Sequence, residues 1–149
     1  MDNKARRASV IALIDLAGGD DYRDRADAGR GLAAFAEMNE ARETLVRLIL
    51  DADDTFVTRV TTEALLRRKD LVGLTIVAAA LAVADSNRGD WINIAVADVL
   101  AVFSRDRDDA LRRCETLALD PDERVRRGAD ELVGMLIEIE PALHAVQNE

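Results

Sequence analysis

The side chains that could do chemistry are few and far apart in this sequence of 149 residues. His144 is the single histidine and Cys114 the single cysteine. A zinc site needs several His or Cys ligands at short spacings, and neither residue has such a neighbour. Arg112 and Arg113 could activate the Cys114 thiol, but the helical stretch LRRCETLAL favours a small core residue there. We therefore predict no metal, no cofactor and no catalytic residue.

Acidic side chains are the abundant reactive group. The sequence has 29 Asp and Glu against 20 Lys and Arg, a formal net charge of -9. The excess grows along the chain, from -1 in residues 1–50 to -3 in 51–100 and -5 in 101–149. Such a surface repels nucleic acid and anionic lipid and favours a basic partner. Two adjacent carboxylates could still act as acid and base, so an enzyme or small-ligand carrier is one alternative.

The elements that must position these side chains are helices. In LALDPDERVRRGADEL (117–132), Asp120 is a natural N-cap, Pro121 suits the first helical position, and Glu123 completes a capping box. From Val125 as position zero, apolar residues follow at +4, +7 and +8, namely Ala129, Leu132 and Val133. This spacing is one apolar face of a helix.

The pattern recurs at a near-constant interval. Its anchors are Arg25, Val57, Ile92 and Val125, separated by 32, 35 and 33 residues. Helical segments at 3–17, 39–50, 70–84 and 106–119 alternate with them, and Gly-Gly, Asp pairs or Ser-Asn supply the turns. No period-two run of useful length occurs. An all-α fold is predicted, with one domain over 1–149 and hairpins near 3–37, 39–68, 70–104 and 106–139.

The stretch from Asp120 to Leu132 resembles the second helix of a HEAT repeat, and residues 53–65 and 90–100 match that pattern less closely. The resemblance covers nearly the whole chain. It implies a right-handed α-α superhelix, an α-solenoid of about four HEAT-like helical hairpins, that binds macromolecules. It also implies a ladder of turn Asp and helix Arg residues between units, formed here by Asp53, Arg59, Asp120 and Arg126.

The second helices of a HEAT array line its concave face, which singles out the positions that point away from the core. At 100° per residue these are -1, +2, +3 and +6. The expected protein-binding residues are therefore Phe56, Arg59, Val60, Glu63, Trp91, Ile94, Asp98, Arg127 and Glu131.

Within that set, Phe56 and Trp91 both occupy position -1, in successive second helices. Together they would form an apolar patch bordered by carboxylates. The alternative for both aromatics is ordinary packing. Asp98 is the acidic residue without a basic neighbour four residues away, whereas Arg59/Glu63 is a spaced pair that could simply solubilise the helix.

These observations favour a non-enzymatic protein-binding module that takes a basic protein partner. A sharper form is an immunity or inhibitor protein that caps a basic toxin. The third possibility is a homo-oligomer joined through the apolar helix from Leu71 to Ala84, which at 14 residues is too short to cross a bilayer. No membrane or nucleic-acid partner is expected.

Residue usage also indicates the compartment and the source of the protein. The single cysteine suits a reducing cytoplasm, and Asp15 interrupts the N-terminal apolar run, which reads as an amphipathic helix instead of a signal peptide. The abundance of Ala, Arg, Asp and Val, with only two lysines, is typical of high-GC bacteria.

Overall fold

The computed structural model describes residues 2–144; Met1 and residues 145–149 of the predicted domain lie outside that range. Within it the chain is all-helical, as predicted, with eight helices and no strand. The helices are α1 (Asn3–Ala17), α2 (Tyr22–Ala33), α3 (Asn39–Ile49), α4 (Thr55–Leu66), α5 (Leu71–Leu81), α6 (Ser86–Leu100), α7 (Ser104–Leu117) and α8 (Glu123–Ile137). None of the described helices is long and apolar enough to cross a membrane.

Aspartates start most of these helices. At six of the eight N-termini an Asp carboxylate accepts a hydrogen bond from a backbone N–H of the first turn. These caps are Asp2, Asp21, Asp54, Asp70, Asp85 and Asp122. Because Asp85 caps α6, the Ser86-Asn87 pair expected in a turn forms the first turn of that helix.

The predicted start of α8 is wrong by two residues. Asp122, not Asp120, caps the helix, and Pro121 lies in the turn before it. The Asp120 N–H still bonds to the Leu117 carbonyl at the end of α7. Its carboxylate accepts from the Asp122 N–H at 2.9 Å. Asp120 therefore shapes the chain reversal, and the second Asp is left to cap the helix.

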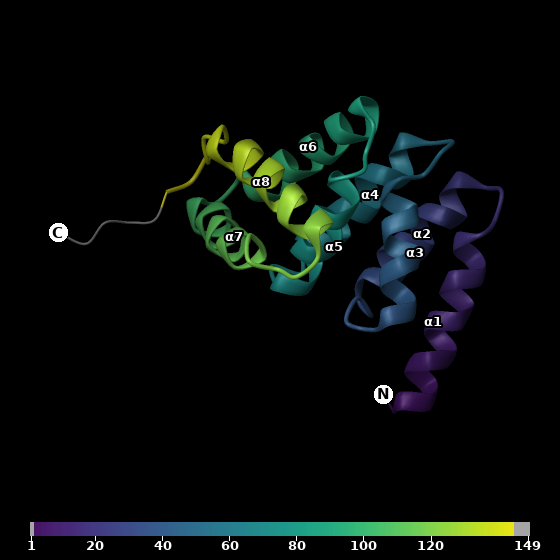
Figure 1. The fold of residues 1–149 in the computed structure, drawn as a ribbon. Coiled ribbons are helices and arrows are strands. Elements are labelled where there is room, and N and C mark those ends of the chain that lie inside the picture. Colours follow the sequence, from purple (N-terminus) through teal and green to yellow (C-terminus); the bar gives the residue numbers. More distant parts are fainter. Residues whose placement is uncertain (1, 145–149) are drawn as a thin grey trace.

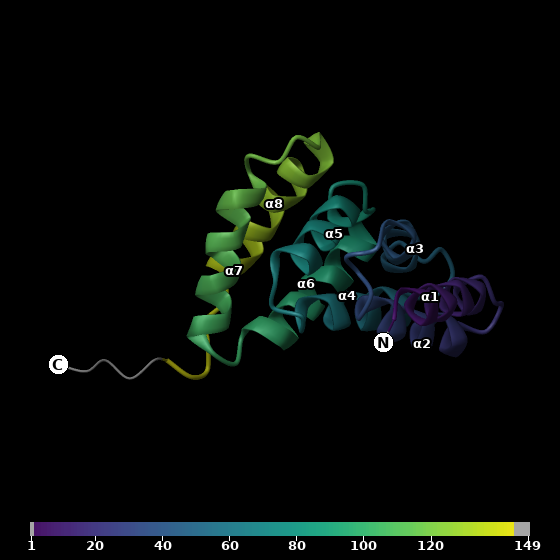
Figure 2. The same ribbon diagram turned by 90° about the horizontal axis from the view of Figure 1, so that it is seen from below.

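The first six helices form two rows. Figure 2 shows α1, α3 and α5 in one row, with α2, α4 and α6 in a second row beside it. Along the second row α2 packs against α4 and α4 against α6, while α3 packs against α5 in the first. Each hairpin thus buries its apolar faces against the next one, which is how stacked helical pairs build a continuous core.

The core is aliphatic and follows the predicted helical spacing. At anchor position zero, Val57, Ile92 and Val125 are buried, and the same is true of Arg25. Burial continues at +4 and +7 or +8 in each second helix, through side chains that include Leu32, Leu65, Val96, Leu100, Ala129 and Leu132. Helix α5 is likewise largely buried, as expected, and α3, α4 and α8 cover it.

The fourth hairpin departs from the two rows. Helix α8 packs mainly on α5 of the other row, and only lightly on α6. In Figures 1 and 2 the α7–α8 pair accordingly stands at a steep angle to the rest. The crossing depends on Gly128, because a Cβ there would lie 1.8 Å from the Ala78 carbonyl oxygen of α5. The absence of a side chain lets the two backbones touch.

Candidate protein-binding face

The solvent-facing side of α2, α4 and α6 carries most of the predicted binding residues, among them Phe56, Trp91, Ile94 and Asp98. This side is called the outer face below. Phe56 of α4 is 39% exposed and Ile94 of α6 is 41% exposed. Trp91 is half-buried, and Asp98 is exposed on the same helix as Ile94. Because α4 packs directly on α6, these side chains share one surface.

An aromatic pair forms where α2 meets α4. Tyr22 lies 5.8 Å from Phe56 between ring centroids, with the ring planes at 88°, and is itself 41% exposed. This edge-on geometry is favourable for two aromatic rings. No ring contact within residues 2–144 joins Phe56 to Trp91. The sequence analysis did not select Tyr22, which directly follows the Asp21 cap. It lies three residues before the anchor Arg25, outside the positions -1, +2, +3 and +6 from which the candidates were chosen.

Two arginines of α2 cover the aromatic pair. The Arg30 guanidinium lies 6.0 Å from the Phe56 ring centroid, and that of Arg23 lies 5.7 Å from the Tyr22 ring. Arg30 also pairs with Asp27 at 3.1 Å. Cations over ring faces are attracted by the ring quadrupole. The rings are thus held in place with their remaining surface open to solvent.

Arg59 joins the carboxylates of the outer face. Its Nε donates to Glu63 at 3.0 Å, and its Nη2 lies 3.6 Å from Asp98 across the α4–α6 boundary. The Glu63 carboxylate, and to a lesser degree that of Asp98, raises the pKa of Arg59. Asp98 therefore has a basic partner that helical spacing could not reveal, since the partner lies on another helix.

The expectation for Val60 is wrong, and Arg127 and Glu131 lie on a helix outside the row of α2, α4 and α6. Val60 is 7% exposed and packs in the core, because +3 adjoins the buried positions 0, +4 and +7 on a real helix. Arg127 and Glu131 are exposed on α8, which packs mainly on α5, and no ion pair joins them within residues 2–144. Glu131 instead lines a shallow hollow with Asp90 and Asn93 of α6.

Beside the outer face, the turns between helices are joined by a buried ion pair. Arg25 donates to Asp51 through two nitrogens, Nε at 2.9 Å and Nη2 at 3.2 Å, and both residues are 8% exposed. Its remaining nitrogen donates to the carbonyls of Gly19 and Asp20 at 3.1 and 2.8 Å. The hydrogen bond to Asp51 raises the pKa of Arg25. Each guanidinium nitrogen and each carboxylate oxygen of the pair thus has at least one hydrogen-bond partner.

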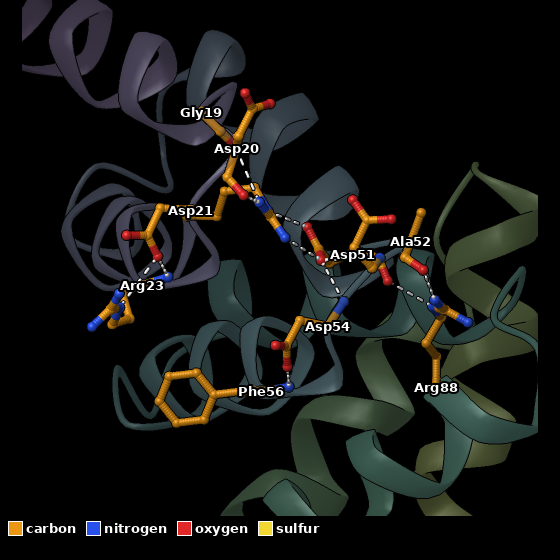
Figure 3. Close-up of polar contacts among 11 residues, drawn as sticks. Gly19, Asp20, Asp21, Arg23, Asp51, Ala52, Asp54, Phe56 and Arg88 are labelled. Carbon is orange, nitrogen blue, oxygen red and sulfur yellow. Dashed lines mark hydrogen bonds and ion pairs between the residues drawn. The ribbon is translucent and has the colours of Figure 1, made fainter.

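The same Asp51 turn is held from the third hairpin. Arg88 of α6 donates to the carbonyls of Asp51 and Ala52, each at 2.8 Å. The Asp51 carboxylate in turn accepts from the N–H of Asp54, the cap of α4, at 2.9 Å. Figure 3 shows these contacts linking the turns of three successive hairpins. This cross-linked edge fixes the first turn of α4, which carries Phe56.

The ladder implied by the HEAT resemblance is built differently here. Arg126 donates to the carbonyls of Asp120 and Pro121 within its own hairpin, at 2.7 and 3.0 Å. Arg59 bonds to Glu63 and Asp98, and not to a turn. The contacts that reach the Asp51 turn from the two neighbouring hairpins come from Arg25 and Arg88.

The basic cluster at the end of α4 is engaged in ion pairs. Arg67 lies 3.5 Å from Glu63, Arg68 lies 2.9 Å from Asp70, and Lys69 lies 3.1 Å from Asp106 of α7. Arg68 also donates to the Ala33 carbonyl at 2.7 Å, which ties the second hairpin to the first. These cations serve packing at a helix end.

Reactive chemistry is sparse in the described part of the chain. Residues 2–144 contain no group of three or more His, Cys, Asp or Glu side chains that could hold a metal ion. Cys114 is 1% exposed within α7, as predicted for a core residue. Burial raises the pKa of its thiol to about 11, from an ordinary value of 9.0.

Native Cys114 is expected to react at least about 100-fold more slowly with iodoacetamide at pH 8 than the denatured chain, since a pKa raised by about two units leaves about 100-fold less thiolate. Comparing alkylation rates with and without denaturant checks this. The same shift stabilises the fold below pH 9 and loses that effect as the pH rises toward about 11. Equal alkylation rates in both states would contradict the burial.

Comparison with protein-family models, with curated proteins and with solved structures finds no match for this chain.

Proposed function

We propose that this protein is a short HEAT-like α-solenoid that binds a basic protein through the outer face of α2, α4 and α6. The observation that carries the proposal is the exposed Tyr22–Phe56 pair, 5.8 Å between centroids, across the boundary of two hairpins. Exposed aromatic side chains fixed at one geometry are the usual anchors of a protein interface. Ile94 extends the apolar surface onto the third hairpin.

The solenoid assignment draws its support from repetition. Three hairpins pack in register, with second helices α2, α4 and α6 side by side. Their interhelix turns are joined through Asp51. In such an array the row of second helices is the surface that meets a partner. The steep fourth hairpin limits this row to three helices.

A basic partner is supported by the charge of the surface. Arg23, Arg30, Arg59 and Arg88 are the cations of α2, α4 and α6 that solvent reaches, and the exposed carboxylates on or just before these helices outnumber them. These carboxylates include Asp21, Asp24, Asp27, Asp53, Asp90 and Asp98. The chain as a whole has a net charge of -9. A complementary positive partner would be steered to this face, more strongly at low salt.

The test is co-purification from a native lysate of the source cells. The bait would be compared with Tyr22→Ala/Phe56→Ala, after circular dichroism confirms that both fold. We expect a basic protein to be retained by the unaltered chain and to be lost at least about tenfold from the variant, as for hot-spot residues. Its retention should weaken with added salt.

A matched control removes apolar side chains elsewhere. Val83, 50% exposed, and Leu119, 86% exposed, lie in the loops after α5 and α7. Val83→Ala/Leu119→Ala should leave retention unchanged. Equal retention by all three baits, or loss from both variants, would contradict binding at the Tyr22–Phe56 pair.

A further inference from the structure

A second surface lies on α1, at one end of the molecule. Lys4, Arg7, Ala8 and Ile11 line a groove together with Asn3, Met38 and Arg6, whose guanidinium pairs with Glu37. Ile11 is 61% exposed, an unusual value for a large apolar side chain. Neither Lys4 nor Arg7 has an acidic partner within residues 2–144, although most arginines of the chain form ion pairs.

The positive charge of Lys4 and Arg7 is not balanced by acidic residues in the first turn of α1. The first turn of α1 contains no acidic residue after the Asp2 cap. A helix N-terminus carries a partial positive charge, which favours acidic neighbours and disfavours cations. Lys4 therefore adds to the positive end of α1, in a chain that is strongly acidic elsewhere. The groove combines positive charge with an apolar centre.

The opposite pole is the C-terminal end of α8. Ile137 is 66% exposed there, and Glu138 and Glu140 beside it are exposed as well. The last turn of α8 contains no basic residue of its own, although the negative end of a helix favours cations. Arg107 of α7 donates to the Ile139 carbonyl at 2.9 Å, and its ion pair is with Asp108. Neither glutamate has a basic partner within the described residues. This end therefore combines negative charge with an apolar centre.

We propose that copies of this chain associate head to tail, with the α8 end of one copy in the α1 groove of the next. Glu138 and Glu140 face Lys4 and Arg7, and Ile137 packs against Ile11. The two poles lie at opposite ends of the molecule, so one copy cannot satisfy its own poles (Figure 1). The contact joins different surfaces and so repeats from copy to copy. It is independent of the proposed binding of a basic protein, because α2, α4 and α6 stay open.

Sedimentation of the full chain at low ionic strength tests the proposal. The average mass should rise with protein concentration above the 16.3 kDa of one copy and return to it at high salt. Lys4→Glu/Arg7→Glu and Glu138→Lys/Glu140→Lys should each weaken association at least about tenfold, because each places like charges together. An equimolar mixture of the two variants should recover association, since the unaltered α1 groove of one meets the unaltered α8 end of the other and their altered poles are also complementary.

Misfolding cannot mimic this result. An acidic residue at position 4 and basic residues at 138 and 140 suit their helix ends, so each variant should be as stable as the unaltered chain or more so. Arg47→Glu/Arg127→Glu, at exposed positions in the last turn of α3 and the first half of α8, changes the net charge by the same amount as the α1 variant and should still associate. A chain that stays monomeric at low salt, or association that survives both pole variants, or a mixture that stays monomeric, would overturn the proposal.

Discussion

Replacing Asp51 by alanine is expected to lower the free energy of unfolding by about 3–5 kcal/mol, the usual cost of removing one partner of a buried ion pair. The substitution would leave the buried Arg25 guanidinium with only the Gly19 and Asp20 carbonyls as partners. It would also strip the Asp54 N–H of its acceptor in the turn before α4. Urea denaturation of both chains measures the difference.

The matched control is Asp53→Ala, two residues along the same turn. Asp53 is exposed, so its loss should change the free energy of unfolding by less than about 0.5 kcal/mol. Because Arg25 and Asp51 share their bonds, Arg25→Ala/Asp51→Ala should cost less than the two single changes together. A loss below about 1 kcal/mol for Asp51→Ala would mean that the pair behaves as if solvent-exposed.

The second large effect is expected at the crossing of α5 and α8. Gly128→Ala would place a methyl group 1.8 Å from the Ala78 carbonyl oxygen and 2.7 Å from its Cα. These are backbone atoms, which cannot rotate away, so the two helices must move apart. We expect a loss of about 3 kcal/mol or more in the free energy of unfolding, at the upper end for an overpacked core. Thermal denaturation would show it as a lower melting temperature.

Gly134, six residues along α8, supplies the control. A Cβ there meets nothing within 4 Å, so Gly134→Ala should stabilise the protein by up to about 1 kcal/mol through helix propensity alone. The same chemical change on one helix thus has opposite expected signs. If both substitutions raised the melting temperature, α8 would not pack on α5 as closely as described.

These two sites act on different parts of the fold. Asp51 anchors the turn that leads into Phe56, and it draws contacts from both neighbouring hairpins. Gly128 instead decides where the fourth hairpin goes, and therefore where Arg127 and Glu131 lie. A loss of binding in Asp51→Ala with folding retained would show that the geometry of this edge matters to the partner.

Part of the candidate face could be predicted from helical spacing. Phe56, Ile94 and Asp98 are exposed as their -1, +2 and +6 positions indicate. The prediction for Val60 is wrong because a helix packed between two neighbours buries a wider stripe than positions 0, +4, +7 and +8 define. Tyr22 was missed because its importance comes from Phe56 on another helix.

The sequence alone determined what depends on short stretches of chain. Apolar residues three and four apart, with Asp ahead of them, determined that the fold is all-helical and which side of α4, α6 and α8 is buried. Only the tertiary structure decided how the helices meet. It placed α8 on α5 through Gly128, paired Arg25 with Asp51, and brought Arg59 to Asp98. Such contacts join residues far apart in the chain, whose mutual position follows from the packing of whole helices and leaves no local pattern to read.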